Sequence, residues 1–141
     1  IIKMVEFAPL RANKILCGGR LAVIQNNVLL DKTMNFSVRI VRSCQYLVKE
    51  KKEDIMSRQL LRSGTSIGAN AHEAVYGASR QDFISKLHIS LKEASETEYW
   101  IILLTKTEYL TSTQSESLLK DCTEIKKILI STLNKAKKAE T

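Results

Sequence analysis

The chain has 141 residues, of which 44% are apolar and 26% charged, with a single proline and five glycines, so its size and composition fit one compact domain rather than two. The aromatic share is only 6%, and Lys, Glu, Leu, Ile, Ser and Ala dominate, which argues against a β-sandwich and against a disordered chain. Lys and Arg outnumber Asp and Glu by 22 to 15, a net charge of +7, and this surplus favours acidic or phosphate-rich partners. The composition therefore predicts an all-α domain and names no activity.

The cysteines suggest neither a disulfide framework nor a zinc site. Cys17, Cys44 and Cys122 form an odd set with wide spacings and no C-x-x-C pair, a pattern that favours a reducing, cytoplasmic setting. The apolar runs before residue 30 are broken by glycine and by polar residues, and each is too short for a signal peptide or a membrane span. We therefore expect a cytoplasmic protein with no membrane segment.

Residues 1–30 differ from the rest of the chain. They hold the only proline and two of the five glycines, and they show no sustained hydrophobic period. We interpret residues 1–30 as a poorly specified N-terminal leader and assign residues 31–141 to one helical bundle domain. From Asp31 onward, four stretches repeat apolar residues with a period of about 3.6, which predicts four helices.

The first predicted helix covers about residues 31–51. Its apolar side is formed by Phe36, Ile40, Cys44, Leu47 and Val48. The other side carries a stripe of four basic residues, Lys32, Arg39, Arg42 and Lys49. Such a stripe can follow nucleic-acid phosphates, but a solvated basic face is the commoner explanation, and no interleaved aromatic residues favour base stacking. The sequence leaves both interpretations open.

The second predicted helix, about residues 54–76, combines an apolar arc with two internal glycines. The arc consists of Met56, Leu60, Ile67, Ala71 and Ala74. Gly64 and Gly68 lie beside it, four residues apart. Because each glycine within a helix costs about 1 kcal/mol relative to alanine, the pair indicates either a close approach of another backbone or a break in the helix.

The third predicted helix runs from Ser79, where Ser79-x-x-Asp82 resembles a capping box, to about Tyr109. One apolar stripe contains Phe83, Leu87, Leu91, Ala94 and Ile101. A second apolar patch falls on another side of the same helix, formed by Ile89, Trp100, Leu103 and Leu104. Since one bundle core buries one stripe, we interpret the second patch as a subunit interface.

The fourth predicted helix, about residues 113–137, begins at a second capping-box pattern, Thr113-x-x-Glu116. Its expected core side consists of Leu118, Cys122, Ile125, Leu129, Thr132 and Ala136, and its expected outer side carries Lys120, Lys126, Lys127 and Lys138. Short connections between the four stretches predict an antiparallel bundle with up-down-up-down topology.

Motifs of known catalytic and metal sites occur only in fragments. Residues 64–68 match G-x-S-x-G, which would make Ser66 a nucleophile with Asp82 and His88 as partners, but that motif requires a strand before it and the pattern here is helical. His72-Glu73 begins an H-E-x-x-H zinc motif, yet Tyr76 occupies the second histidine position. There is no P-loop and no dinucleotide-binding glycine pattern. We therefore expect no catalytic residues, no metal and no cofactor.

Several polar residues fall within or beside the apolar arcs. Ser66, Asn70 and Glu73 align along one edge of the second helix, and Glu98 interrupts the stripe of the third. A carboxylate in such a place needs a partner, and Arg62 is a candidate, together with the hydroxyls of Ser63 and Ser66. These residues form either a polar pocket or a structural hydrogen-bonded network that fixes helix register, and the network is the commoner arrangement in bundles.

The order and spacing of several segments resemble the four-helix-bundle proteins encoded in intervening sequences of bacterial 23S rRNA genes. The hallmark segment is residues 60–70, LLRSGTSIGAN, followed by Glu73-Ala74. Further matching segments are FSVRIV at 36–41, EKK at 50–52, DFISKL at 82–87, LKEA at 91–94, ETEYW at 96–100 and YL at 109–110. The resemblance covers about residues 31–138, and the combined motif is long and specific.

The resemblance implies a ring-shaped homopentamer of antiparallel four-helix bundles without known catalytic activity. A related branch, the accessory variability proteins of diversity-generating retroelements, consists of basic pentamers that bind nucleic acid and a reverse transcriptase. We therefore expect a non-enzymatic oligomer that contacts RNA or DNA through its basic helix faces. The alternative is a scaffold that docks a protein partner such as a reverse transcriptase. Residues 31–141 hold 18 basic and 14 acidic residues, so only +4 of the net charge lies on the predicted bundle.

Overall fold

The computed structural model describes residues 27–138, and these form four long α-helices with short connections and no β-strand. The helices are α2 (Val28–Lys51), α3 (Ile55–Val75), α4 (Arg80–Lys106) and α5 (Ser112–Lys138). The predicted all-α class and the four helices are confirmed. Most of the predicted leader lies outside the described residues. Its last residues do not, because α2 begins at Val28, and Leu29 and Leu30 are buried in the core.

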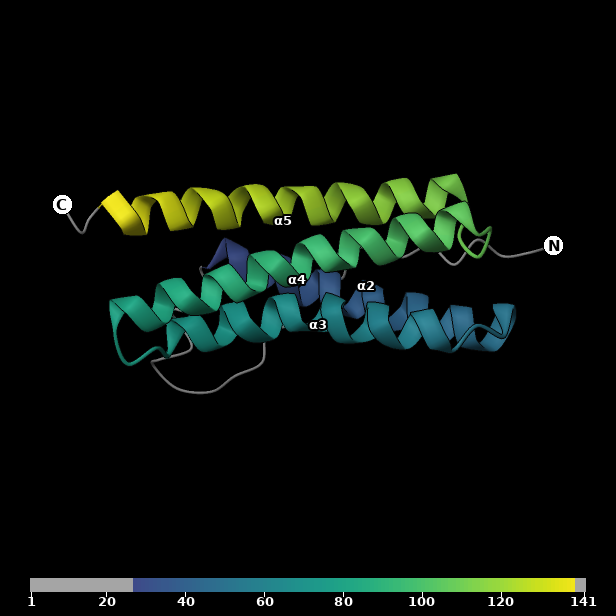
Figure 1. Cartoon of the computed structure of the whole chain (residues 1–141), viewed down its shortest axis with the longest axis horizontal. Coiled ribbons are helices and arrows are strands. Elements are labelled where there is room, and N and C mark those ends of the chain that lie inside the picture. Colours follow the sequence, from purple (N-terminus) through teal and green to yellow (C-terminus); the bar gives the residue numbers. More distant parts are fainter. Residues whose placement is uncertain (1–26, 139–141) are drawn as a thin grey trace.

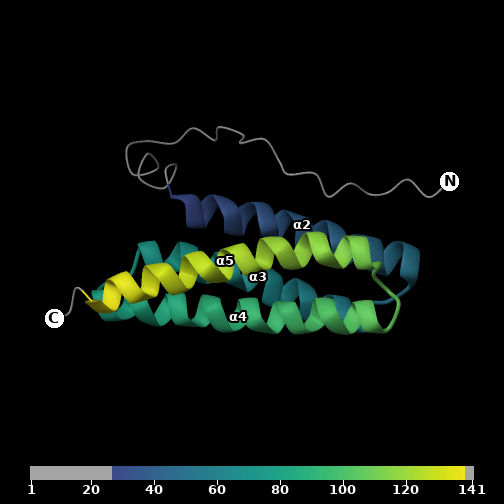
Figure 2. The ribbon, with the colours of Figure 1, turned by 90° about the horizontal axis from the view of Figure 1, so that it is seen from above.

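Each helix packs against its neighbours in sequence, and α2 also packs against α5, so that the four helices enclose one core. Figures 1 and 2 show the helices lying side by side along the long axis of the molecule. The core is aliphatic, with one phenylalanine and two cysteines. Its largest fully buried side chains are Phe36, Ile40, Leu47, Leu60, Ile67, Leu87, Ile101, Leu104, Leu118, Ile125 and Leu129. No helix within residues 27–138 is long and apolar enough to cross a membrane.

Side-chain hydrogen bonds cap the N-terminal ends of α2, α4 and α5. Asn27 Oδ1 accepts hydrogen bonds from the backbone of α2, and Ser79 Oγ accepts one from the Asp82 N–H at 3.1 Å, as its capping-box pattern predicted. At α5 the reciprocal pair is Thr111 and Gln114, rather than the predicted Thr113 and Glu116. The cap therefore lies two residues before the predicted one, and α5 begins at Ser112 instead of at about residue 113.

The start of α3 depends on a residue that the sequence pattern did not single out. Glu53 is buried, and its carboxylate accepts hydrogen bonds from the N–H groups of Ile55, Met56 and Ser57 at 2.8 to 3.0 Å. Three bonds from otherwise unpaired donors, together with the positive end of the helix dipole, compensate for burying this charge. Glu53 thereby fixes the turn between α2 and α3.

The two glycines of α3 mark a close approach of α2, not a break in the helix. A Cβ added to Gly64 would lie 2.8 Å from both γ carbons of Ile40, and one added to Gly68 would lie 3.3 Å from Thr33 Cβ. Both positions lie well inside α3. Of the two sequence interpretations, close approach is therefore confirmed, and it brings the backbone of α3 against the side chains of α2.

Two predicted apolar positions are wrong. Val48 was expected in the core, but it is 48% exposed, because the preceding Leu47 takes the core position and successive residues turn by about 100° around a helix. Leu104 was expected on a subunit interface, but it is fully buried. Leu104 follows Ile101 by three residues and so belongs to the same core stripe of α4.

Candidate functional site

The basic stripe predicted on the first helix is partly used in contacts with α5. Lys32 Nζ donates a hydrogen bond to Glu124 Oε1 at 2.7 Å. This hydrogen bond and the charge of Lys32 hold the pKa of Glu124 below its ordinary value. Arg42 and Lys49 are exposed, as predicted. The stripe is therefore not a continuous free surface for phosphates.

Arg39 was predicted to face solvent, and this prediction is wrong, because its side chain is only 9% exposed. Its guanidinium forms an ion pair with Asp121, donates from Nη2 to Ser117 Oγ at 2.6 Å, and donates from Nη1 to the Ser117 carbonyl oxygen at 3.3 Å. On α2 it lies between the buried residues Phe36 and Ser43, at the border with α5. A guanidinium in that place requires an acceptor, and Arg39 therefore joins α2 to α5.

The lysines predicted on the last helix fall into two groups. Lys120 and Lys127 are exposed, as predicted. Lys126 is half-buried and donates from Nζ to Glu98 Oε2 at 2.7 Å. Glu98 was expected to need a partner, with Arg62 as a candidate, but its partner is Lys126, because Glu98 lies on the side of α4 that meets α5.

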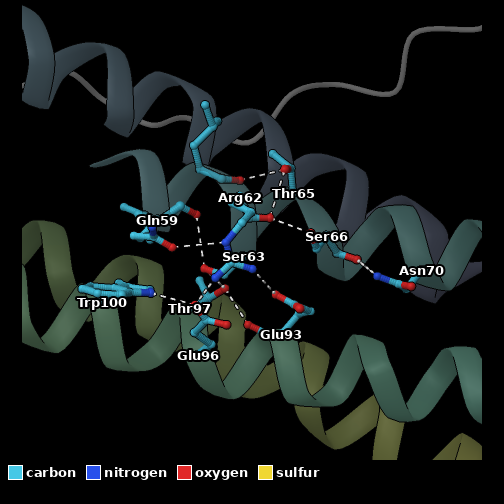
Figure 3. Close-up of polar contacts among 12 residues, drawn as sticks. Gln59, Arg62, Ser63, Thr65, Ser66, Asn70, Glu93, Glu96, Thr97 and Trp100 are labelled. Atoms are coloured by element: carbon cyan, nitrogen blue, oxygen red, sulfur yellow. Dashed lines mark hydrogen bonds and ion pairs between the residues drawn. The ribbon is translucent and has the colours of Figure 1, made fainter. Parts of the chain in front are cut away.

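The guanidinium of Arg62 instead forms a surface cluster between α3 and α4 (Figure 3). It makes ion pairs with Glu93, at 3.5 Å, and with Glu96. Its Nε donates to Gln59 Oε1 at 3.2 Å, and Trp100 Nε1 donates to Glu96 Oε1 at 3.1 Å. Figure 3 shows these side chains converging across the gap between the two helices. The cluster fixes the relative position of α3 and α4.

Beneath this cluster, buried hydroxyl groups join the same two helices. Thr97 Oγ1 donates to Ser63 Oγ at 3.0 Å, and Ser90 Oγ donates to the Ile67 carbonyl oxygen at 2.8 Å. Ser63, Ser90 and Thr97 are fully buried. Of these three residues, the sequence analysis included only Ser63 in the predicted polar set. Because serine and threonine count as polar, the hydrophobic pattern did not place Ser90 and Thr97 in the core. Their regular spacing on α4, seven residues apart, is the signal that could have found Ser90 and Thr97.

The polar set predicted on α3 therefore does not form one network. Ser66 Oγ donates to the Arg62 carbonyl oxygen at 2.6 Å, and Asn70 Nδ2 donates to the Ser66 carbonyl oxygen at 2.8 Å, both within the helix (Figure 3). Glu73 is exposed and pairs with Lys86 at 2.7 Å. These residues support the helix and its contact with α4 separately. The polar pocket that the sequence left open is not formed by them.

The fragments of catalytic and metal motifs lie in helical surroundings. Ser66 and its flanking glycines lie inside α3, with helix before and after, whereas a nucleophile elbow requires a strand-to-helix turn. The His72 ring packs against the Tyr76 ring with centroids 5.5 Å apart. In the described part of the chain, no three His, Cys, Asp or Glu side chains lie close enough together to hold a metal ion.

Two of the three cysteines are buried core thiols, and Cys17 lies outside the described residues. Cys44 Sγ donates to the Ser57 carbonyl oxygen at 3.2 Å, and Cys122 Sγ donates to the Ala94 carbonyl oxygen at 3.4 Å. Burial raises the pKa of each thiol to about 12. Both therefore stay protonated at neutral pH and are poor nucleophiles and poor metal ligands.

Exposed apolar side chains gather on two surfaces. On α4, the predicted interface residue Ile89 is exposed, while Trp100 and Leu103 are half-buried. The second surface was not predicted: an apolar groove between α2 and α3, which we call the α2–α3 groove. It is lined by Val41, Cys44, Gln45, Val48, Lys49, Ser57, Arg58 and Leu61. The exposed residues at 34, 41 and 48 follow one another every seventh residue, a spacing that repeats on one side of a helix.

Comparisons with known proteins agree with this architecture. The family model of the 23S rRNA-intervening sequence protein matches residues 25–131. A crystal structure of a protein of unknown function from the S23 ribosomal protein family of Bacteroides thetaiotaomicron is 58% identical, with a TM-score of 0.75. That similarity covers 75% of this chain and 98% of the other. No curated protein matches the chain. Because the family model spans more than half of the sequence, the chain belongs to the 23S rRNA-intervening sequence protein family.

Proposed function

We propose that this protein is a non-enzymatic oligomer that contacts the phosphates of RNA or DNA through exposed basic side chains. The observation that carries the proposal is that, among the described residues, most acidic side chains have partners within the fold, whereas many basic side chains do not form ion pairs. Among residues 27–138, seven acidic side chains form ion pairs with six basic ones. Glu53 and Asp82 additionally accept hydrogen bonds from backbone N–H groups at helix starts. Nine of the thirteen acidic residues in 27–138 are thus used within the bundle, and at its surface the exposed lysines outnumber the four acids that remain, which are Asp31, Glu50, Glu108 and Glu116.

Assembly would multiply this surplus. We propose an up-down-up-down bundle that forms a cytoplasmic homopentameric ring, a topology supported by the short connections and by the packing of α2 against both α3 and α5. In a ring, each copy repeats the same basic surface. A modest charge per chain then becomes a strong field per assembly, which raises both the affinity and the association rate for a polyanion.

Salt dependence tests the nucleic-acid contact. A fluorescent RNA hairpin and a DNA duplex of equal length are titrated with the assembled protein at several salt concentrations, and binding is followed by anisotropy. Phosphate contact predicts that log K falls linearly with log salt, with a slope of about −0.9 for each phosphate that is neutralised on a duplex. Absence of binding at low salt, or binding that does not respond to salt, contradicts the proposal.

Self-association is tested on the two apolar surfaces. Trp100→Glu alters the α4 surface and Val48→Glu alters the α2–α3 groove, and light scattering reports the molecular mass of each variant beside the wild type. A charge placed in an interface core disfavours assembly by desolvation. We expect one of the two substitutions to lower the mass. A wild-type mass of one chain, or an unchanged mass for both variants, contradicts the proposal of a ring held by these surfaces.

The α2–α3 groove also favours a second candidate function, a scaffold that docks a protein partner. An exposed aliphatic groove beside basic side chains suits an amphipathic helix with an acidic flank. The scaffold predicts that a purified partner stays bound after nuclease treatment and is lost with Leu61→Glu. Loss of the same partner on nuclease treatment alone would instead favour nucleic acid as the bridge between the two proteins.

A further inference from the structure

The charge of α5 is divided sharply along its length. Its first half, residues 112–124, contains three acidic residues against one lysine. Its second half, residues 125–138, contains no Asp or Glu and five lysines, namely Lys126, Lys127, Lys135, Lys137 and Lys138. The first half supplies the acidic partners of α2 described above. All the charged side chains of the second half are therefore basic, and the net charge of the chain does not reveal this asymmetry.

The second half of α5 lies beside the first half of α4, which is basic as well. Figures 1 and 2 show the C-terminal end of α5 next to the beginning of α4. Lys135 and Arg80 line one surface depression there, and Lys137, Lys92 and His88 line a second. The basic residues of two helices therefore gather at one end of the bundle, which we call the basic end.

Three exposed lysines of the basic end have no acidic partner within the described residues. Asp82 is the one acidic residue within 80–92, and its carboxylate accepts a hydrogen bond from the Ala78 N–H in the α3–α4 turn. Lys92, Lys135 and Lys137 are exposed, and none of them forms an ion pair with any residue in the 27–138 range. The charges of these three lysines are thus available to an external anion.

Helix stability explains only part of this arrangement. Lysines in the last turn of α5 interact favourably with the negative end of the helix dipole. The same rule disfavours Arg80, which stands at the first residue of α4, where the dipole is positive. Like charges gathered from two helices also repel one another. A bound polyanion would relieve the mutual repulsion of these lysines.

From this placement we propose that the basic end is the surface that binds the phosphate backbone of nucleic acid, an inference that rests on the proposed function and gives it a location. The second half of α5 is about 20 Å long at 1.5 Å per residue. Along one strand of a duplex this length passes about six phosphates, at about 3.4 Å each. The contacts are with phosphates, so the basic end binds RNA and DNA with little dependence on base sequence.

Two charge-matched double variants test the location. Lys135→Glu/Lys137→Glu alters the basic end, and Arg42→Glu/Lys51→Glu alters exposed residues of α2 outside the α2–α3 groove by the same change in net charge. Both act on exposed helix positions, and circular dichroism and light scattering verify that each variant stays folded and assembled. The full chain is titrated against the same RNA hairpin, DNA duplex and a single-stranded DNA of equal length, each at several salt concentrations.

The basic end predicts unequal effects. Each lost phosphate contact costs a factor of about 5 at about 0.15 M salt, from the slope of about 0.9 per phosphate. Lys135→Glu/Lys137→Glu therefore weakens binding by about 30-fold or more and lowers the salt slope by about 2. The α2 variant changes the affinity by only a few fold, through the long-range field. Lys135→Gln/Lys137→Gln gives the same slope change without adding repulsion.

The outcomes distinguish a wrong binding surface from a protein that does not bind nucleic acid at all. Equal weakening by both charge-matched variants overturns the location while the protein still binds nucleic acid. Loss confined to the α2 variant also overturns it. A wild type that binds none of the three nucleic acids overturns the proposed function itself. A stronger effect on one of the three probes supports the location and identifies the kind of backbone that the basic end prefers.

Discussion

Substitution of Gly64 by alanine tests the close approach of α2 and α3 directly. In an open helix this change stabilises by about 1 kcal/mol. Here the new methyl group would lie 2.8 Å from both γ carbons of Ile40, a fully buried and branched side chain that cannot rotate away. Overpacking of a core costs about 1–3 kcal/mol. Because Ile40 cannot move aside, we expect an overpacking cost of about 2–3 kcal/mol. Subtracting the gain of about 1 kcal/mol in helix propensity, Gly64→Ala should lower the free energy of unfolding by about 1–2 kcal/mol.

The assay is urea unfolding followed by circular dichroism at one fixed protein concentration, because assembly makes stability depend on concentration. Gly68→Ala is the matched control. Its new methyl group would lie 3.3 Å from Ser37 Oγ and Thr33 Cβ, which leaves a net effect of about 0.5 kcal/mol or less once the gain in helix propensity is counted. Gly64→Ala should therefore be clearly the more destabilising of the two.

A double-mutant cycle identifies the cause. Ile40→Ala removes both γ carbons and by itself costs about 2–5 kcal/mol by leaving a cavity. In that background the methyl group introduced by Gly64→Ala enters the vacated space, so the glycine substitution should become neutral or stabilising by about 1 kcal/mol. If Gly64→Ala stabilises the otherwise unchanged protein by its full helix propensity, or if its effect is the same in both backgrounds, the reasoning is refuted.

Three further outcomes follow from the same structure. Arg39→Met should lower the free energy of unfolding by about 2 kcal/mol, less than a fully buried pair because its aspartate partner is 38% exposed, while Arg42→Met stays within about 0.5 kcal/mol in the same urea assay. In a Cys17→Ser variant, the two buried thiols should react with a thiol reagent at pH 8 only on unfolding. Because their folded pKa is raised to about 12 from an ordinary 9.0, the free energy of unfolding should fall as the pH rises between these values, and replacing both cysteines by alanine should reduce that fall. In Lys32→Met, the pKa of Glu124 should rise toward its ordinary value in an NMR titration; an unchanged pKa would contradict the pairing.

The four helices were predictable because a hydrophobic period of about 3.6 is a property of each helix alone. Gly64 and Gly68 were recognisable as special for a similar reason, but the sequence left open a close approach or a break in the helix, and the packing against Ile40 decides between them. The residues at which the helices start were harder to predict. The pattern Thr113-x-x-Glu116 is a valid capping box, but Thr111 and Gln114 form an equally good one, and no local rule chooses between them.

The sequence could not predict which charged side chains pair with one another across helices. Arg39 lies at the edge of the apolar arc of α2, and whether such an edge faces solvent or a neighbouring helix depends on where α5 packs. Glu98 likewise pairs with Lys126 on α5, not with Arg62, because the partner is set by the angle at which the helices meet. The sequence of a helix determines which residues share one side of it. Which neighbouring helix that side contacts depends on how the helices pack.

The same distinction changes how the charge of the protein should be read. From the sequence, the four basic residues of the first helix looked like the strongest phosphate-binding surface. Packing ties Lys32 and Arg39 to acids in the first half of α5, which removes the α2 stripe as a continuous surface. By drawing the acids of α5 into contact with α2, the fold leaves the lysine-rich second half beside the basic start of α4. One end of the bundle thereby holds a helix segment with five lysines and no acidic residue, and it is this local arrangement, not the net charge, that makes phosphate binding testable residue by residue.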